Sequence, residues 1–322
     1  MSAAASTSTP SSAESARQLR IGLSYGLAAY AFWALVFPLQ IAWLNAEAPA
    51  DATANPTRWS IEVLGHRLVW SLALCVVLIR VRGQGSALRQ AFADRRLFWR
   101  LVATAILMTG NWLIFLLAIS RGELYRAGIG YFLTPMVHIV LGITFLGERL
   151  RRFQAVAVGS ATLGVGYLMF LSGELPWIEL GLALFPGFYG LLRKGMSTGP
   201  LVGFTVESIL LFPAALAVVI YMSMQSDAPS GFIEGSLTTK GLLVLTGIGT
   251  ALPLIWFAAA ALRLPLVTIG VLHFLAPTGQ FLLGVLAFGQ RPPEPEAWFG
   301  YAAIWLGALM LVGQMLSRRD GS

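Results

Sequence analysis

Long apolar runs separated by short polar segments dominate this chain, and each run has the length of a membrane-crossing helix. A helix needs about 20 mostly apolar residues to cross the hydrocarbon core of a bilayer. Most of the polar segments between the runs are too short to hold a soluble domain. The pattern predicts ten membrane-spanning helices, at 21–44, 60–80, 97–120, 124–147, 151–171, 175–193, 200–222, 240–261, 266–289 and 296–316.

Only two connections and the two ends of the chain offer longer polar sequence. We expect 81–96 and 223–239 to form a surface helix or a flexible loop. Residues 1–18 are rich in Ser, Ala, Thr and Pro, which predicts a disordered tail and no cleavable signal peptide. Residues 317–322 form a second short tail.

The composition also indicates a lipid environment. Of the 322 residues, 57% are hydrophobic and 11% are charged, whereas a soluble domain carries about 25% charged residues. The net charge of +7 does not indicate nucleic acid, because the basic residues fall in short segments between the apolar runs. The single cysteine, Cys75, excludes a disulfide framework and a thiolate metal site, and we expect no cofactor. We therefore expect an all-α polytopic membrane protein, with the lipid bilayer as its partner and no nucleic acid.

The distribution of Lys and Arg predicts the orientation in the membrane, because basic residues are retained on the cytoplasmic side. With the N-terminus inside, 16 of the 22 Lys and Arg residues fall on the cytoplasmic side and five fall outside. The remaining one, Arg67, lies within a predicted span. We expect an integral membrane protein with both termini in the cytoplasm.

The chain matches itself at an offset of 142 residues, so that 111–149 aligns with 253–291 without a gap. Twelve of the 39 aligned positions are identical, which is more than shared apolar composition usually yields. The identical pairs include Phe115 with Phe257, Pro135 with Pro277, and Gly147 with Gly289.

This duplication predicts two five-helix repeats, at 20–172 and 175–316. Because five is an odd number, the second repeat enters the membrane from the opposite side, and we expect inverted repeats. Secondary transporters commonly have this construction, in which a site at the repeat interface is exposed to either side in turn. The symmetry therefore predicts a transporter of a small-molecule substrate.

Several motifs resemble a known family. The predicted fourth span ends in Phe-Leu-Gly-Glu-Arg at 145–149, and the ninth ends in the related Phe-Gly-Gln-Arg at 288–291. With the ten spans, these motifs resemble the EamA repeats of the drug/metabolite transporter superfamily. The chain is similar to the RarD-type permeases of that superfamily in four stretches: Gly-His-Arg-Leu-Val-Trp-Ser at 65–71, Gly-Asn-Trp at 110–112, Gly-Tyr-Phe-Leu-Thr-Pro at 130–135, and Phe-Tyr-Gly-Leu-Leu-Arg-Lys at 188–194.

The resemblance covers about 20–316 and implies a permease of the bacterial inner (plasma) membrane, named for a link to chloramphenicol sensitivity. It implies an exporter of small metabolites or drugs that works by alternating access. One position departs from the family pattern, because the second repeat has Gln290 where a Glu is usual. A structural or gating role of that carboxylate would therefore not be symmetric.

Ionisable residues within the spans are functional candidates, since each costs about 2.5 to 3.5 kcal/mol at the centre of a helix on insertion scales. His66 and Arg67 lie in the second predicted span and Glu207 in the seventh, which are equivalent helices of the two repeats. We expect Arg67 and Glu207 to pair across the repeat axis, with His66 close enough to take part in proton coupling. Two alternatives stay open: Arg67 reaches the outer interface, or the pair is purely structural.

One face of the fourth span and the equivalent face of the ninth carry residues suited to a central cavity. They could orient a small polar substrate, with prolines that kink the helices. The alternative is that the polar groups only join helices by hydrogen bonds. The residues are Tyr131, Pro135 and His138 in the fourth span and His273, Pro277 and Gln280 in the ninth.

The resemblance adds four cavity candidates, because it places their helices around the cavity. They are Trp33, Asn111, Tyr189 and Trp256. Small residues in the fifth and tenth spans predict close helix packing, and an oligomer is an unsupported alternative. The small residues include Gly159, Gly164, Gly166, Gly300 and Gly307.

Two other functions fit the sequence less well. A membrane-embedded enzyme acting on a lipid or a small amphipathic substrate needs a cluster of nucleophile, base or metal ligands, and the three histidines are far apart in sequence. A passive channel has no need of inverted repeats. No Gly-x-x-x-x-Gly-Lys-Ser/Thr sequence is present, which excludes nucleotide hydrolysis and leaves protons as a candidate coupling ion.

Overall fold

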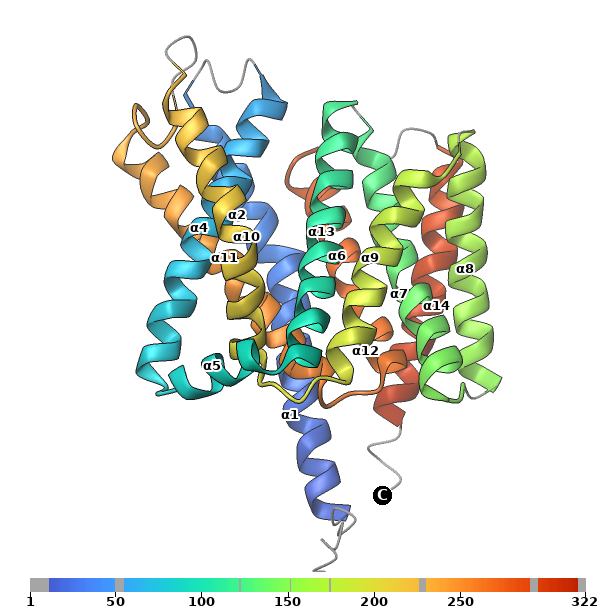
Figure 1. Ribbon diagram of the computed structural model, residues 1–322. Coiled ribbons are helices and arrows are strands. Elements are labelled where there is room, and N and C mark those ends of the chain that lie inside the picture. Colours follow the sequence, from blue (N-terminus) through green and yellow to red (C-terminus); the bar gives the residue numbers. More distant parts are fainter. Residues whose placement is uncertain are drawn as a thin grey trace, which may run out of the picture.

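The computed structural model is all-helical in the part of the chain that it describes, which is 12–49, 55–121, 123–150, 152–173, 175–225, 230–289 and 295–317. Eight of these helices are long and apolar enough to cross a membrane. The helices stand side by side in a bundle, and the described chain begins and ends at the same end of it (Figure 1). The all-helical membrane class is confirmed, while the count of ten spans stays a prediction.

The first half of the chain begins with one long helix that is interrupted by a π-helical turn. Its parts are α1 (Ser12–Ala31), η1 (Phe32–Val36) and α2 (Phe37–Ala46). The helices that follow are α4 (Pro56–Val81), α5 (Gly85–Ala93), α6 (Arg95–Ser120), α7 (Leu124–Leu146) and α8 (Arg152–Ser172).

The second half contains a helix that is divided in two near its middle. Its parts are α12 (Leu266–His273) and α13 (Leu275–Leu286), separated at Phe274. The other helices are α9 (Trp177–Lys194), α10 (Pro200–Ser223), α11 (Leu237–Ala261) and α14 (Ala297–Ser317).

Local sequence signals set several helix ends. The Asn55 side chain accepts a hydrogen bond of 3.0 Å from the Arg58 N–H and starts α4, with Pro56 in the first position, where no N–H is needed. Glycine ends α7 at Gly147 (φ 63°) and follows α13 at Gly289 (φ 65°), in the left-handed region that favours glycine. These two glycines are 142 residues apart, the offset at which the sequence matches itself.

The structure differs from the predicted organisation at three places. α1 begins at Ser12, so residues 12–18 are helical rather than a disordered tail, and the Gln18 amide donates to Glu14 at 2.9 Å. The predicted span at 266–289 is divided at Phe274, three residues before a proline that lacks the N–H needed to continue the hydrogen-bond ladder. α5 is a surface helix that lies across the lower end of the bundle (Figure 1). Residues 1–11, Gln290 and 318–322 lie outside the described residues.

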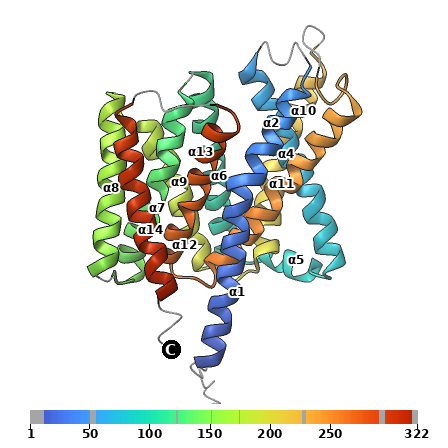
Figure 2. The ribbon, with the colours of Figure 1, turned by 180° about the vertical axis from the view of Figure 1, so that it is seen from behind.

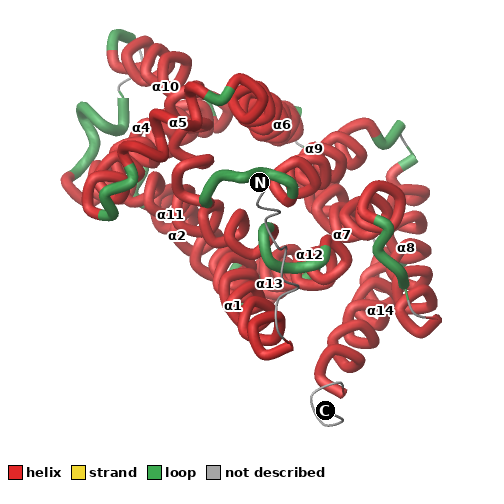
Figure 3. Tube along the Cα trace, turned by 60° about the horizontal axis from the view of Figure 1, so that its bottom comes forward, coloured by secondary structure: helices red, strands yellow, loops and turns green. Residues whose placement is uncertain are grey.

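α8 and α14 form a closely packed pair at one side of the bundle, where they stand next to each other in two opposite views (Figures 1 and 2). Viewed from the end that carries α5, this pair lies outside α7 (Figure 3). A Cβ on Gly164 would stand 2.5 Å from the carbonyl oxygen of Gly300, so the two backbones meet where side chains are absent. Close packing is therefore the role of Gly164, Gly300 and Gly307, whereas Gly159 and Gly166 face open space.

Gly164→Ala should destabilise the protein, because the new methyl group meets backbone atoms of α14 that cannot move aside. We expect a loss of about 1 to 3 kcal/mol, seen as a lower midpoint of thermal unfolding in detergent. Gly166→Ala is the matched control, since nothing lies within 4 Å of its added Cβ. Equal midpoints for the two variants would contradict the packing of α8 on α14.

Candidate functional site

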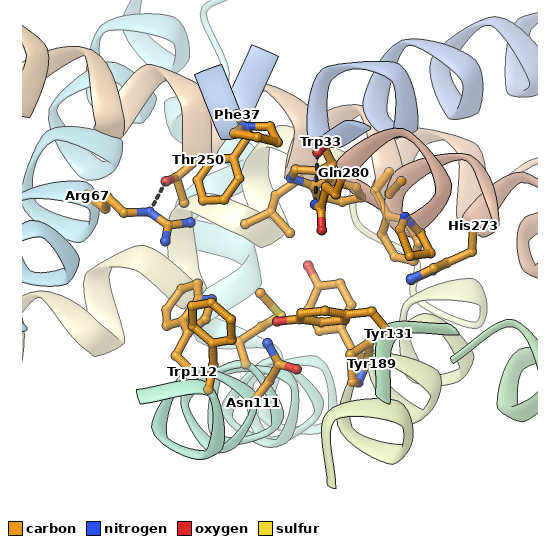
Figure 4. Close-up of a pocket in the computed structure, with 18 of the residues that line it drawn as sticks. Trp33, Phe37, Arg67, Asn111, Trp112, Tyr131, Tyr189, Thr250, His273 and Gln280 are labelled. Carbon is orange, nitrogen blue, oxygen red and sulfur yellow. Dashed lines mark hydrogen bonds between the residues drawn. The ribbon is translucent and has the colours of Figure 1, made fainter. Parts of the chain in front are cut away.

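A cavity of about 320 Å³ lies in the middle of the bundle, between helices from both halves of the chain (Figure 4). Its volume is in the range of small-molecule sites, and its wall is mostly apolar with a few polar groups. The aromatic lining residues are Trp33, Phe37, Trp112, Phe115, Tyr131, Tyr189 and Phe257. The polar or charged lining residues are Arg67, Asn111, His138, Thr250, His273 and Gln280.

Most of the cavity candidates from the sequence lie in this wall. The lining includes Trp33, Asn111, Tyr131, His138, Tyr189, His273 and Gln280. Trp256 is not part of the lining, and its ring packs against that of Phe32 with 6.4 Å between centroids. Pro277 lines the cavity but Pro135 does not, and α7 continues through Pro135 without a break. That the lining residues contact a substrate stays a prediction.

Sequence reasoning missed other lining residues although the internal alignment pointed to them. Phe115 and Phe257 were aligned as an identical pair, and both lie in the wall. The alignment offset thus selects lining positions from both halves of the chain. The lining pairs separated by 142 residues are Met108 with Thr250, Trp112 with Leu254, Phe115 with Phe257, Tyr131 with His273, and His138 with Gln280.

The π-helical turn η1 carries Trp33 into the cavity. In a π-helix each N–H bonds to the carbonyl five residues earlier, as Phe37 does with Phe32. The next residue, Pro38, has no N–H, which leaves the Trp33 carbonyl without that partner. The Gln280 amide donates to this carbonyl at 3.0 Å and joins η1 to α13.

His138 and His273 lie together in the cavity wall, with 5.5 Å between ring centroids. His138 is fully buried, and its Nδ1 donates to the carbonyl of Thr134 at 3.1 Å. No side chain in the described part of the chain partners Nε2 of His138 or Nδ1 of His273. The two rings therefore have unused hydrogen-bonding atoms.

Arg67 reaches the cavity from α4, where Figure 4 shows it at one end of the space. Its Nε donates to the hydroxyl of Thr250 at 2.9 Å. Its guanidinium carbon lies 4.9 Å from the centroid of the Phe37 ring, a cation–π distance. Arg67 is thus part of the cavity and does not extend to the outer interface.

The predicted pair of Arg67 with Glu207 is wrong, because Glu207 bonds to Arg193 instead. Inverted repeats place equivalent residues at mirrored depths, so Arg67 lies in the half of the bundle where α4 begins and Glu207 in the opposite half, where α10 begins. His66 is also apart from Glu207. It accepts a hydrogen bond from Trp70 at 3.3 Å, and its ring lies 4.7 Å from that of Phe232.

Glu207 is the centre of a buried polar group that we call the inner cluster, made of Thr104, Tyr189, Arg193 and Glu207. Thr104 donates to one oxygen of Glu207 at 2.5 Å. The other oxygen accepts from the Tyr189 hydroxyl at 3.2 Å and from Arg193 at 3.4 Å. Since Tyr189 also lines the cavity, the inner cluster joins α6, α9 and α10 at the cavity's lower boundary.

Glu148 from the Phe-Leu-Gly-Glu-Arg motif caps a second helix at this end of the bundle. Its two oxygens accept from the backbone N–H groups of Leu266 and Val267 at 2.7 and 2.8 Å, which are the first two residues of α12. Lys194 lies 3.8 Å from the same carboxylate and donates to the carbonyl of Leu264. The equivalent position in the second repeat, Gln290, lies outside the described residues.

A smaller cavity of about 90 Å³, here called the outer cavity, extends the central one toward the opposite end of the bundle. The two cavities share Phe37, Arg67, Trp112 and Phe115. The outer cavity continues to Asn45 near the end of α2 and to Ser60 near the start of α4. Arg67 therefore lies where the two spaces meet.

These features define a polytopic helical membrane protein with a central binding cavity. No family model matches the chain. It is 36% identical over 297 residues to Protein RarD of Escherichia coli, covering 92% of this chain and 95% of that protein. It is equally identical over 297 residues to Protein RarD of Streptomyces exfoliatus, and 35% identical over 257 residues to the "Chloramphenicol-sensitive protein RarD" of Pseudomonas aeruginosa. The shares covered are 92% and 90% for the former, and 78% and 84% for the latter.

The chain belongs to the RarD family. Other relatives are named transporters, among them one from Bacillus subtilis that is 33% identical over 292 residues, covering 90% of this chain and 92% of that one. A solved crystal structure also matches 91% of this chain and 96% of its own, with a TM-score of 0.62 and 19% sequence identity. That structure supports the fold alone.

Glu207→Ala should strongly destabilise the protein, because it leaves the buried guanidinium of Arg193 without its carboxylate. We expect a loss of about 3 to 5 kcal/mol, measured as a shift in the unfolding midpoint. Adding Arg193→Ala should cost less than the sum of the two single changes. Arg67→Ala combined with Glu207→Ala should be additive within about 0.5 kcal/mol, since the two residues share no partner. Coupling between Arg67 and Glu207 would instead restore the pair expected from the sequence.

Proposed function

We propose that this chain is a secondary transporter that carries a small molecule across the inner membrane by alternating access at the central cavity. The observation that carries the proposal is that the cavity continues toward one end of the bundle and is bounded by the inner cluster toward the other. A molecule in the cavity could leave by either side if the two boundaries opened in turn.

Symmetry supports the proposal. Five pairs of lining residues are separated by the repeat offset, and the left-handed glycines after α7 and α13 have the same separation. This agrees with two inverted five-helix repeats and ten crossings, in which α9 and α14 complete the set. A site shared by both repeats can be exposed to either side with similar energy.

The orientation follows from the basic residues. With the chain ends in the cytoplasm, the inner cluster lies on the cytoplasmic side and the outer cavity faces outward. The conformation described here is then open to the outside. Opening the cytoplasmic side requires Glu207 to separate from Arg193, and a proton taken up by Glu207 would remove the charge that holds them together. Protons are for this reason our proposed coupling ion.

The names of the relatives suggest where to begin with substrates. One relative is called a chloramphenicol-sensitive protein, so chloramphenicol is the first drug to test for export by this chain. Drugs and metabolites of similar size agree with the volume of the cavity.

Alternating access can be tested without a known substrate by labelling a cysteine in the cavity. In a Cys75→Ala background, Met108→Cys should react with a membrane-impermeant thiol reagent added from outside, and much less from inside. Glu207→Gln should raise the rate of labelling from inside, because it removes the charge that binds Arg193. The rates are measured in right-side-out and inside-out vesicles.

Two controls make the result specific. Ser60→Cys, in the outer cavity, should react from outside whether or not Glu207 is changed. Glu234→Gln removes an exposed carboxylate and should leave all rates unchanged. Equal labelling of Met108→Cys from both sides in every variant would favour a channel over a transporter.

A further inference from the structure

Arg67 is a cation in the cavity wall without an anion. Its one hydrogen bond to protein goes from Nε to the neutral hydroxyl of Thr250. Among the described residues, no carboxylate lies within 4 Å of it, and no Asp or Glu lines the cavity. The two terminal nitrogens of the guanidinium therefore have no acceptor in the described part of the chain.

The buried arginines elsewhere in the protein are used differently. Arg126 is 1% exposed and bonds to Glu179 at 2.8 Å, and Arg193 is 2% exposed and bonds to Glu207 at 3.4 Å. A charge at membrane depth is normally paired or faces a water-filled space. Arg67 has the second of these environments, so its charge is available to whatever occupies the cavity.

The position of Arg67 suits the capture of an anion that enters from outside. It lies where the outer cavity meets the central one, and Figure 4 shows His273 at the far end of the space. Aromatic rings fill the wall between the two, including those of Trp112 and Tyr131. Such a wall favours a flat apolar body, and a guanidinium binds the two oxygens of a carboxylate in a fork geometry.

The number of cations favours a carboxylate over a phosphate. Arg67 is the one Arg or Lys among the lining residues that the structure describes. A phosphate ester carries about −1.5 to −2 charges at neutral pH, which would leave a net negative charge in a membrane-embedded cavity. A monoanion is balanced by Arg67 alone.

We propose that the cavity binds a small aromatic or similarly flat carboxylate, with the carboxylate on Arg67 and a hydrogen-bonding group directed to His138 and His273. This inference rests on the proposed function and names its substrate class. The two histidines offer ring nitrogens without protein partners for that second group. A neutral compound of the same shape gains the aromatic contacts but not the ion pair.

The test compares two probes of nearly equal shape, 4-hydroxyphenylacetate and its neutral amide, on the purified full-length protein in nanodiscs. Binding is followed by intrinsic fluorescence, to which Trp33 and Trp112 contribute from the cavity wall, and by the shift of the unfolding midpoint. The carboxylate should bind more tightly than the amide. Arg67→Gln should weaken carboxylate binding by roughly 10- to 100-fold and leave amide binding within about twofold.

Two variants control for charge and for folding. Arg67→Lys keeps the charge without the fork and should restore part of the carboxylate affinity. Arg121→Gln removes a positive charge outside the cavity, where the side chain lies over Trp177, and should leave both affinities unchanged. The unliganded unfolding midpoint of each variant shows that it is folded.

Three results would overturn the inference: equal affinity for the acid and the amide, no binding of the acid by the folded protein, or the same stabilisation by chloride as by the acid. The cysteine-labelling experiment does not involve either probe. Alternating labelling without carboxylate binding would therefore reject the substrate class and keep the transporter, whereas failed labelling would reject the proposed function itself.

Discussion

Inside a bilayer no water is available to the backbone, so every N–H and carbonyl group that a helix leaves free needs a partner from the protein. The helices of this chain are interrupted where the central cavity lies, and side chains from distant segments supply the missing partners. Gln280 bonds to the Trp33 carbonyl that Pro38 leaves free. Glu148 binds the first N–H groups of α12. The interruptions are thus tied to the opposite half of the chain, and the cavity is built around these ties.

Charges at membrane depth obey the same constraint and separate the structural sites from the candidate binding site. Arg126 and Arg193 each bond to a buried carboxylate, at opposite ends of the bundle. A buried pair of this kind costs desolvation but fixes which helices meet. Arg67 has no such partner among the described residues and faces the cavity instead. An unpaired charge in a binding space is a cost to the empty protein that a ligand of opposite charge removes.

The internal repeat was the sequence feature that came nearest to the site. An offset read from 39 aligned positions selects lining residues from both halves, including Phe115 with Phe257 and Tyr131 with His273. The same symmetry led to the wrong partner for Arg67, because an inverted repeat matches residues in sequence and reverses their depth in the membrane. Arg193, at the end of α9, was counted only as part of the cytoplasmic positive charge, and no local pattern marked it as the partner of Glu207.

The sequence alone determined the helical membrane class, the duplication, the family resemblance and most of the residues that line the cavity. Each of these depends on properties that belong to one segment or to an alignment of two, such as apolar length and the spacing of glycines and prolines. Only the tertiary structure decided that Glu207 bonds to Arg193, that Arg67 faces the cavity, and that Trp256 stays outside it. Those outcomes depend on the rotation and depth of each helix, which are set by packing against several neighbours at once.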